Sequence, residues 1–317
     1  MQIEWNSYSL DKIKRLFMFD KNTDKVTIYM EDWMPRVDVH MEYVIETIRQ
    51  HPHIKFDLIP DCPLQIKDKP DNLNIKWNAS NDQGYFWRGY KQCKHLNPIP
   101  EKDIEHTVCI FNGGYTLKRN AMCLLLYYNN FWNTKYCYKI HMARQASLQL
   151  TGKINEKIQS LGASKINKFL RSTNNLETTP AKNYADRVMI QKNVMDKTFI
   201  NLIAGPNDEN NIVWPYVDEK IIMPIINKSI WLMFDTDGWY KNLKQFYGFK
   251  TFDNIFDYSF DSINDWQDRA INIVDQICVL DKLSRQDQHK LYMDCKHIID
   301  YNYDHLVSGN WITYAQI

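Results

Sequence analysis

The chain of 317 residues carries 39 basic and 38 acidic side chains, which gives a formal net charge of +1. That balance excludes an argument from overall charge for nucleic-acid or membrane binding, and the length suits two domains of ordinary size or one large domain. The seven cysteines are scattered without a C-x-x-C pair, which indicates a reducing compartment. No signal peptide is visible, and no apolar run reaches the roughly 18–20 residues that span a bilayer. We therefore predict a cytoplasmic protein without a membrane partner; its oligomeric state is not indicated.

The first third of the chain has the pattern of a βαβ unit. Residues 1–24 are polar and mixed, and are interpreted as a helix or an arm. Lys25 to Met30 is rich in β-branched and aromatic residues, Val39 to Arg49 has helical apolar spacing, and Ile54 to Ile59 is a second short apolar run. Strand, helix and strand within about 35 residues predict a parallel sheet.

Four carboxylates follow the two predicted strands of this unit. Ligands of parallel sheets sit at the carboxyl ends of the strands, so these acids fall where chemistry is expected. Asp38 is favoured among them, because it is expected in the loop just before the crossover helix. The four residues are Glu31, Asp32, Asp38 and Asp61.

A second strand–helix unit begins at Thr107. The run Thr107 to Phe111 predicts a buried strand, Asn112-Gly113-Gly114 a turn, and Leu117 to Tyr128 a helix that opens with Lys118 and Arg119. Glycines let backbone amides approach an anion, and arginine binds phosphate bidentately, so the arrangement is typical of an anion site. The alternative is an ordinary surface arginine near a helix start.

Residues 141–200 are the most basic region, with ten Lys or Arg against four Asp or Glu. Within it, Ile154 to Leu170 is predicted to be an amphipathic helix. Either the region presents a cationic face to a polyanion, or it is a solvated helix face. Three of its cations are candidate acceptor contacts: Lys165, Lys168 and Arg171.

Asp218-Glu219-Lys220 opens an apolar helical run that leads into a short strand, Ile230 to Phe234. A lysine at a helix start adds a full charge to the positive end of the helix dipole, and a carboxylate can accept ribose hydroxyl protons. The plainer interpretation is a helix N-cap with a first-turn acid.

After this strand, Asp235-Thr236-Asp237 imitates a D-x-D metal motif, but is interpreted as a loop because of its place after the Glu-Lys helix. Asp265 to Leu280 is predicted to be a helix, and Arg285 to Val307 a last long helix.

The order acid-Glu-Lys, a proline four residues on, an apolar strand, then Leu243 and Gly248-Phe249-Lys250-Thr251-Phe252 resembles a glycosyltransferase family of tailed phages and large viruses. That family carries the recurrent signature TEK…P…L…GFKTF…D.S.D, and Asp218 stands where its threonine is usual. The Glu-Lys pair is also similar to that of the inverting α1,3-fucosyltransferases. The likeness covers roughly residues 105–280.

The resemblance implies an α/β fold with two Rossmann-like domains facing a cleft, the GT-B-like glycosyltransferase architecture. It implies an acceptor-side domain at 1–103, a nucleotide-sugar donor domain at 104–284, and a C-terminal helix at 285–317 that crosses back. Glu219 would hold the donor ribose, and Lys220 and Arg119 the diphosphate, with Asn112, Gly113 and Lys118 around them.

The implied reaction moves a sugar from a nucleoside-diphosphate sugar to a hydroxyl, with Asp38, Glu31 or Asp32 as the base. No metal and no other cofactor is expected, because two cationic side chains already face the diphosphate. A hydroxymethylated base in viral double-stranded DNA is one acceptor, which would place the protein in the host-cell cytoplasm; a glycan is the other. The alternative from a different class is a non-catalytic nucleic-acid-binding module built on the basic region 141–200.

Overall fold

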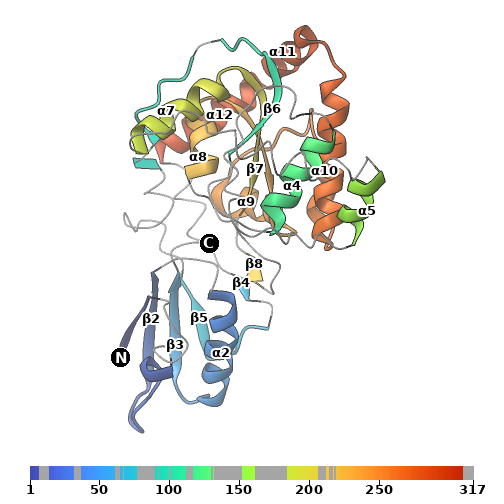
Figure 1. The fold of residues 1–317 in the computed structure, drawn as a ribbon. Helices are drawn as coiled ribbons and strands as arrows, with labels where there is room; N and C mark the ends of the chain where they lie inside the picture. Colours follow the sequence, from blue (N-terminus) through green and yellow to red (C-terminus); the bar gives the residue numbers. More distant parts are fainter. Residues whose placement is uncertain are drawn as a thin grey trace.

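The computed structural model describes most of the chain. The described residues are 1–6, 14–31, 37–60, 65–66, 68–76, 90–91, 93–99, 101–111, 117–129, 131, 152–160, 184–205, 212–213, 217 and 219–309. They form a mixed α/β structure with two parallel sheets (Figure 1).

The first sheet has four parallel strands in the order β1-β2-β3-β5. They are β1 (Gln2–Asn6), β2 (Lys25–Glu31), β3 (Lys55–Pro60) and β5 (Leu73–Ile75), and the helix α2 (Val37–Gln50) connects β2 to β3. The predicted βαβ unit is therefore confirmed. The core on the α2 side is formed by Val26, Ile28, Val44, Ile48, Phe56 and Leu58, all buried.

Two expectations for this sheet are wrong. Residues 2–6 are a strand, not a helix or an arm, because they pair in parallel with Thr27–Glu31. Asp38 lies in the first turn of α2 and not in the loop before it.

The second sheet has three parallel strands in the order β6-β7-β9. Its strands β6 (His106–Ile110), β7 (Thr198–Ala204) and β9 (Ile230–Phe234) are buried, apart from a half-buried His106. Parallel strands with both faces covered have this near-continuous apolar character.

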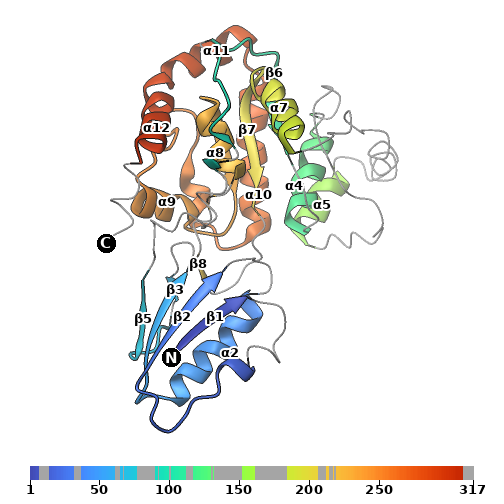
Figure 2. The same ribbon diagram turned by 90° about the vertical axis from the view of Figure 1, so that its left-hand side faces the viewer.

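Helices cover both faces of the second sheet. Figure 1 shows α4, α5 and α10 on one side and α7, α8 and α12 on the other, and Figure 2 gives the turned view. Their bounds are α4 (Leu117–Tyr128), α5 (Lys153–Ser160), α10 (Trp266–Asp281), α7 (Tyr184–Met195), α8 (Glu219–Ile226) and α12 (Lys296–Ser308). α5 ends at Ser160, and the rest of the helix predicted to Leu170 lies outside the described residues.

On the side of β9 without a strand partner in the described part of the chain, a side chain binds the backbone. Tyr240, in α9 (Trp239–Tyr247), accepts a hydrogen bond through its hydroxyl from the backbone N–H of Met233 and donates to the carbonyl of Met233 at 3.3 Å. An edge strand with unpaired backbone groups invites association with another strand, and the buried tyrosine satisfies both backbone groups of Met233.

The Gly248–Phe252 stretch has packing roles. The Asn302 side chain accepts from the backbone N–H of Lys250 at 2.8 Å and donates to its carbonyl at 2.9 Å. Phe249 packs edge-on against His305, and Phe252 against Trp231. These contacts fix the stretch between α12 and the second sheet.

The last predicted helix is two helices, α11 (Arg285–Asp294) and α12, because Cys295 takes ψ −3° and turns the chain. α12 packs on α8, and Asp300 of α12 pairs at 2.7 Å with Lys228 in the turn that follows α8. The predicted crossing toward the first half stays untested, since residues 310–317 lie outside the described part.

A short antiparallel ladder connects the loops of the two halves. β4 (Gln65–Ile66) pairs with β8 (Ile212–Val213), which lies in the connection between β7 and α8. Within the described residues, none of the helices has the length and apolar character needed to cross a bilayer.

Candidate ligand site at the carboxyl edge of the second sheet

Arg119 lies in the first turn of α4 and reaches the end of a neighbouring strand. Its side chain is buried, 6% exposed, and its Nε donates to the carbonyl of Ala204, the last residue of β7, at 3.0 Å. Lys118 beside it is buried as well, at 4% exposed. The interpretation of Arg119 as a surface residue is therefore wrong. A buried guanidinium at the carboxyl end of a parallel sheet stands where such sheets bind ligands.

Glu219 and Lys220 are the first two residues of α8, so the predicted helix start is confirmed. Lys220 is half-buried, and the side chain of Glu219 lies outside the described part. The apolar residues of α8 are all buried: Ile221, Ile222, Met223, Ile225 and Ile226. Lys220 therefore stands at the polar start of an otherwise apolar helix, which is where a cation can serve a ligand.

The end of β9 is held by an arginine that sequence analysis missed. Arg269, in α10, is 1% exposed, and its Nε donates to the carbonyl of Asp235 at 2.9 Å. The same guanidinium donates to the carbonyl of Ile263. The signal in the sequence was a cation on the apolar stripe of a helix, next to Ala270 and Ile273, but its partners are backbone groups that no local pattern reveals.

Asp235 lies against the end of β7. Its carboxylate accepts from the backbone N–H of Thr236 at 2.8 Å, and a Cβ on Gly205 would overlap that carboxylate. Gly205 in turn donates its backbone N–H to the carbonyl of Phe234 at 2.8 Å. A side chain at position 205 would therefore require the buried Asp235 carboxylate to move.

The start of α9 is occupied by the protein's own carboxylate. Asp261 accepts from the backbone N–H groups of Tyr240 and Lys241, both at 3.0 Å. Burial raises the pKa of Asp261, while these two hydrogen bonds and Arg269 act to lower it. The positive end of α9 therefore has its anion already, and it is not open to a phosphate.

No group of three potential metal ligands occurs among the described side chains. Asp235 is buried against Gly205, and Asp237 is half-buried. The described residues thus give the D-x-D motif no third ligand.

Two of the candidate base residues lie in described elements of the first sheet. Glu31 is the last residue of β2, and Asp38 is the second residue of α2. Their side chains lie outside the described part, as do Asp32 and Asp61, so their choice as base stays a prediction. Asn112 and Gly113 also lie outside it.

The described lysines of the basic region are paired with carboxylates. Lys153 pairs with Asp265 and Asp268, and Lys157 with Asp275 at 3.1 Å, which ties α5 to α10. Lys192 pairs with Asp196 at 2.6 Å, and Lys197 with Glu105. The local positive excess is therefore partly neutralised in three dimensions. Lys165, Lys168 and Arg171 lie outside the described residues.

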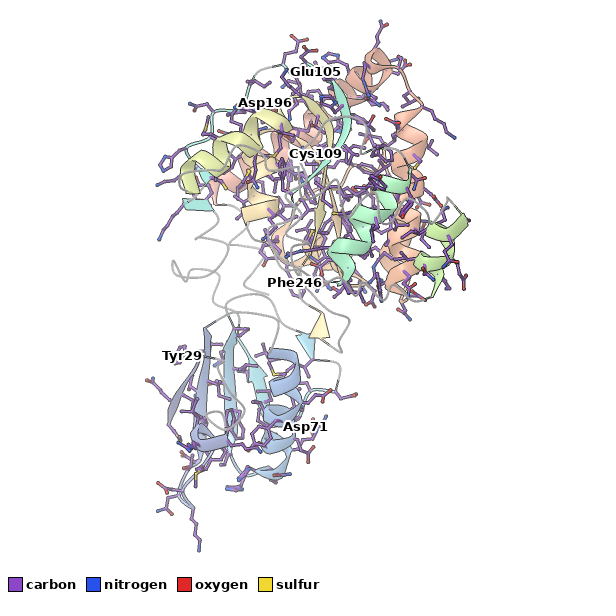
Figure 3. All side chains as sticks on the ribbon, viewed as in Figure 1. Tyr29, Asp71, Glu105, Cys109, Asp196 and Phe246 are labelled. Carbon is purple, nitrogen blue, oxygen red and sulfur yellow. The ribbon has the colours of Figure 1, made fainter. Side chains whose placement is uncertain are left out.

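Besides Arg269, the sequence analysis missed another buried cation, which lies at the amino ends of the strands of the second sheet. Lys102 is 2% exposed and donates to the carbonyl of Met195 at 2.8 Å and to the hydroxyl of Ser229. Figure 3 labels Asp196 and Glu105, which precede β7 and β6 at this end. Burial lowers the pKa of Lys102 to about 7, against the opposing effect of Asp196. Its contacts join the segments before β7 and β9, so we assign it a structural role.

The chain matches no protein-family model, no curated protein and no solved structure.

Proposed function

We propose that the protein is a glycosyltransferase that moves a sugar from a nucleoside-diphosphate sugar to a hydroxyl acceptor. The observation that carries the proposal is Arg119: a guanidinium in the first turn of a helix, buried and bonded to the end of the central strand. Lys220 begins the helix that follows that strand. Two cations that follow the carboxyl ends of neighbouring parallel strands suit a diphosphate.

In the proposed reaction the two cations stabilise the charge that develops on the leaving diphosphate as the glycosidic bond breaks. Glu219 holds the donor ribose, as the family resemblance implies. A carboxylate from the first half, Asp38, Glu31 or Asp32, removes the proton from the attacking hydroxyl. The donor is a substrate, and no resident cofactor is part of the proposal.

The proposed function also includes a proposed domain architecture. The two parallel sheets are compatible with two Rossmann-like domains facing a cleft, with the acceptor-side domain at 1–103 and the donor domain at 104–284. The acceptor is then a hydroxymethylated base in viral DNA or a glycan.

A nucleic-acid-binding module without catalysis is the competing function. The ion pairs of Lys153, Lys157, Lys192 and Lys197 weigh against it, since each of these lysines already contacts a carboxylate. Phosphate binding would have to displace those partners or use other residues.

Calorimetric titration with UDP, GDP, ADP and CMP tests the proposal. We expect one nucleotide to bind, and Lys220→Ala to weaken it at least tenfold, the usual loss when a charged partner of a phosphate is removed. Arg119→Lys keeps the charge but loses the planar fork, so its affinity should fall as well. Lys94→Ala, an exposed lysine remote from both helix starts in sequence, is the control. Binding of none of the nucleotides, or unchanged affinity in both variants, would contradict the proposal.

A further inference from the structure

The carboxyl edge of the second sheet has a cationic and an acidic end. Lys118 and Arg119 belong to the helix that follows β6, at one side of the sheet. Asp235 and Asp237 follow β9, at the other side, and Asp261 binds the start of the next helix there. Arg269 places a cation beside these three acids, and its guanidinium donates to the backbone carbonyl of Asp235. Neighbouring strands lie about 4.8 Å apart, so the two ends are separated by on the order of 10 Å.

The acidic end holds a hydroxyl without a hydrogen-bond partner among the residues that the structure describes. Thr236 is 4% exposed, and no described residue donates to or accepts from its Oγ1, although its backbone N–H is bonded to Asp235. Three residues on, the indole N–H of Trp239, 1% exposed, is likewise unpartnered. Native proteins pair almost all of their buried polar groups, so two unsatisfied groups in one turn indicate that something else binds them.

A phosphate is a poor partner for this turn. The backbone amides at the start of α9 are taken by the carboxylate of Asp261. Burial is the main cause that raises the pKa of Asp261, and Asp237 adds a smaller effect in the same direction. A further anion would be repelled, whereas a hydroxyl-rich or amide-bearing group can donate to carboxylates.

We propose that the turn Asp235–Gly238 binds the nucleoside part of the donor, with the Thr236 hydroxyl bonded to its ribose or base. The proposal rests on the function proposed above and states how the donor nucleotide is oriented in that site. The diphosphate lies toward Arg119 and Lys220, and the uncharged nucleoside lies toward the end of β9. The charge distribution of a nucleoside diphosphate is complementary to this edge, because its anionic diphosphate meets the cationic end and its uncharged nucleoside meets the acidic end.

The test uses Thr236→Val, which keeps the side chain's shape and removes its hydroxyl, with Thr236→Ser as the matched variant that keeps it. Affinities are measured by calorimetry for the nucleoside diphosphate that binds best and for inorganic pyrophosphate. We expect Thr236→Val to weaken the nucleoside diphosphate about tenfold, to leave pyrophosphate unchanged, and to unfold at the same or a higher denaturant concentration than the parent. Thr236→Ser should bind both ligands like the parent.

Three outcomes overturn the proposal. If Thr236→Val binds the nucleoside diphosphate like the parent, the hydroxyl meets only a buried water, and the proposed function still stands. If it loses nucleoside diphosphate and pyrophosphate equally, the turn is not the nucleoside end. If the parent binds no nucleoside diphosphate, the proposed function fails together with the inference. Thr236→Ala replaces Thr236→Val in the same measurements if the valine variant does not fold.

Discussion

The two parallel sheets differ in how they bury their strands. Along β3 the side chains alternate between buried and half-exposed, and Asp57 lies on the half-exposed face with Lys25 at 3.0 Å and Lys76 at 3.4 Å. Every residue of β7 and β9 is buried. Charged groups of the first sheet can therefore pair in partial contact with water, whereas those of the second must be satisfied inside the protein.

This difference explains where the buried cations of the second sheet lie. A fully covered sheet offers polar groups only at its two edges, where strands end and backbone carbonyls lose their ladder partners. Arg119 and Arg269 bind such carbonyls at the carboxyl edge, and Lys102 binds the carbonyl of Met195, the last residue of α7, at the amino edge. The need to pair these backbone carbonyls therefore places buried cations at both edges: in a candidate ligand site at the carboxyl edge, and at Lys102, with a structural role, at the amino edge.

The largest expected effect tests whether the two cores are separate. Leu232 in β9 and Leu58 in β3 are each completely buried, in different clusters. Leu232→Ala and Leu58→Ala should each cost about 2–5 kcal/mol in unfolding free energy, because each leaves a cavity. Amide hydrogen exchange should accelerate in β7 and β9 for the first variant and in β2 and β3 for the second. Val279→Ala, at a residue 61% exposed, is the control. Equal acceleration in both sheets would contradict the separation.

Lys102 should make the stability of the second sheet depend on pH. Its pKa is near 7 in the folded protein and about 10.4 in the unfolded chain, so between these values the unfolded state binds more protons. Stability therefore rises with pH in that window, by at most about 1.4 kcal/mol per unit. Asp196, Lys192, Cys109 and the ring of Tyr292 face the ammonium.

Lys102→Met should remove this rise in denaturant titrations at pH 7, 8 and 9, whereas Lys94→Met, at an exposed position, should keep it. An unchanged pH slope in Lys102→Met would show that the lysine keeps its proton in the folded state.

Asp57 should give the first sheet the opposite sensitivity, at low pH. Hydrogen bonds from Asn74 and the nearby lysines lower its pKa from 3.8 to about 2. The stabilisation is present above pH 4 and is lost as pH falls toward 2. Asp57→Asn should cost on the order of 1 kcal/mol at pH 6, since both lysines are more than half exposed and screened, and should cost less at pH 2. Asp71→Asn, at an exposed aspartate, is the control, and an equal cost at both pH values would contradict the pairing.

The smallest effect concerns the ion pairs between α5 and α10. Lys153→Gln and Lys157→Gln should each change the unfolding free energy less than Asp57→Asn does, because exposed ion pairs contribute little and are screened by salt. The loss should vanish at about 1 M salt. If either variant instead weakens DNA binding with a clear change in its salt dependence, the nucleic-acid-binding alternative gains support.

The sequence by itself predicted the elements whose side-chain pattern is strong. The strands β2, β3, β6 and β9 and the helices α2, α8 and α10 follow from side-chain periodicity. The structure adds an N-cap to α10, where the Asp265 side chain accepts from the backbone N–H groups of Gln267 and Asp268. β1 was missed because a five-residue strand is stabilised by its pairing with β2, which lies about twenty residues further along the chain. The break at Cys295 was missed because it changes backbone angles without a glycine or proline to mark it.

The candidate site depended more on the tertiary structure. Strand, turn and basic helix start predicted an anion site at Arg119, and the acid–lysine helix start predicted one at Lys220, but the sequence left a surface arginine open as the alternative. The carbonyl that holds Arg119 belongs to Ala204, 85 residues away, and the two that hold Arg269 follow β9 and precede α10. Local patterns record which side chains avoid water, because that preference repeats with the period of the helix or strand. They do not record which buried polar group meets which distant carbonyl, because that pairing exists only after the sheet has formed.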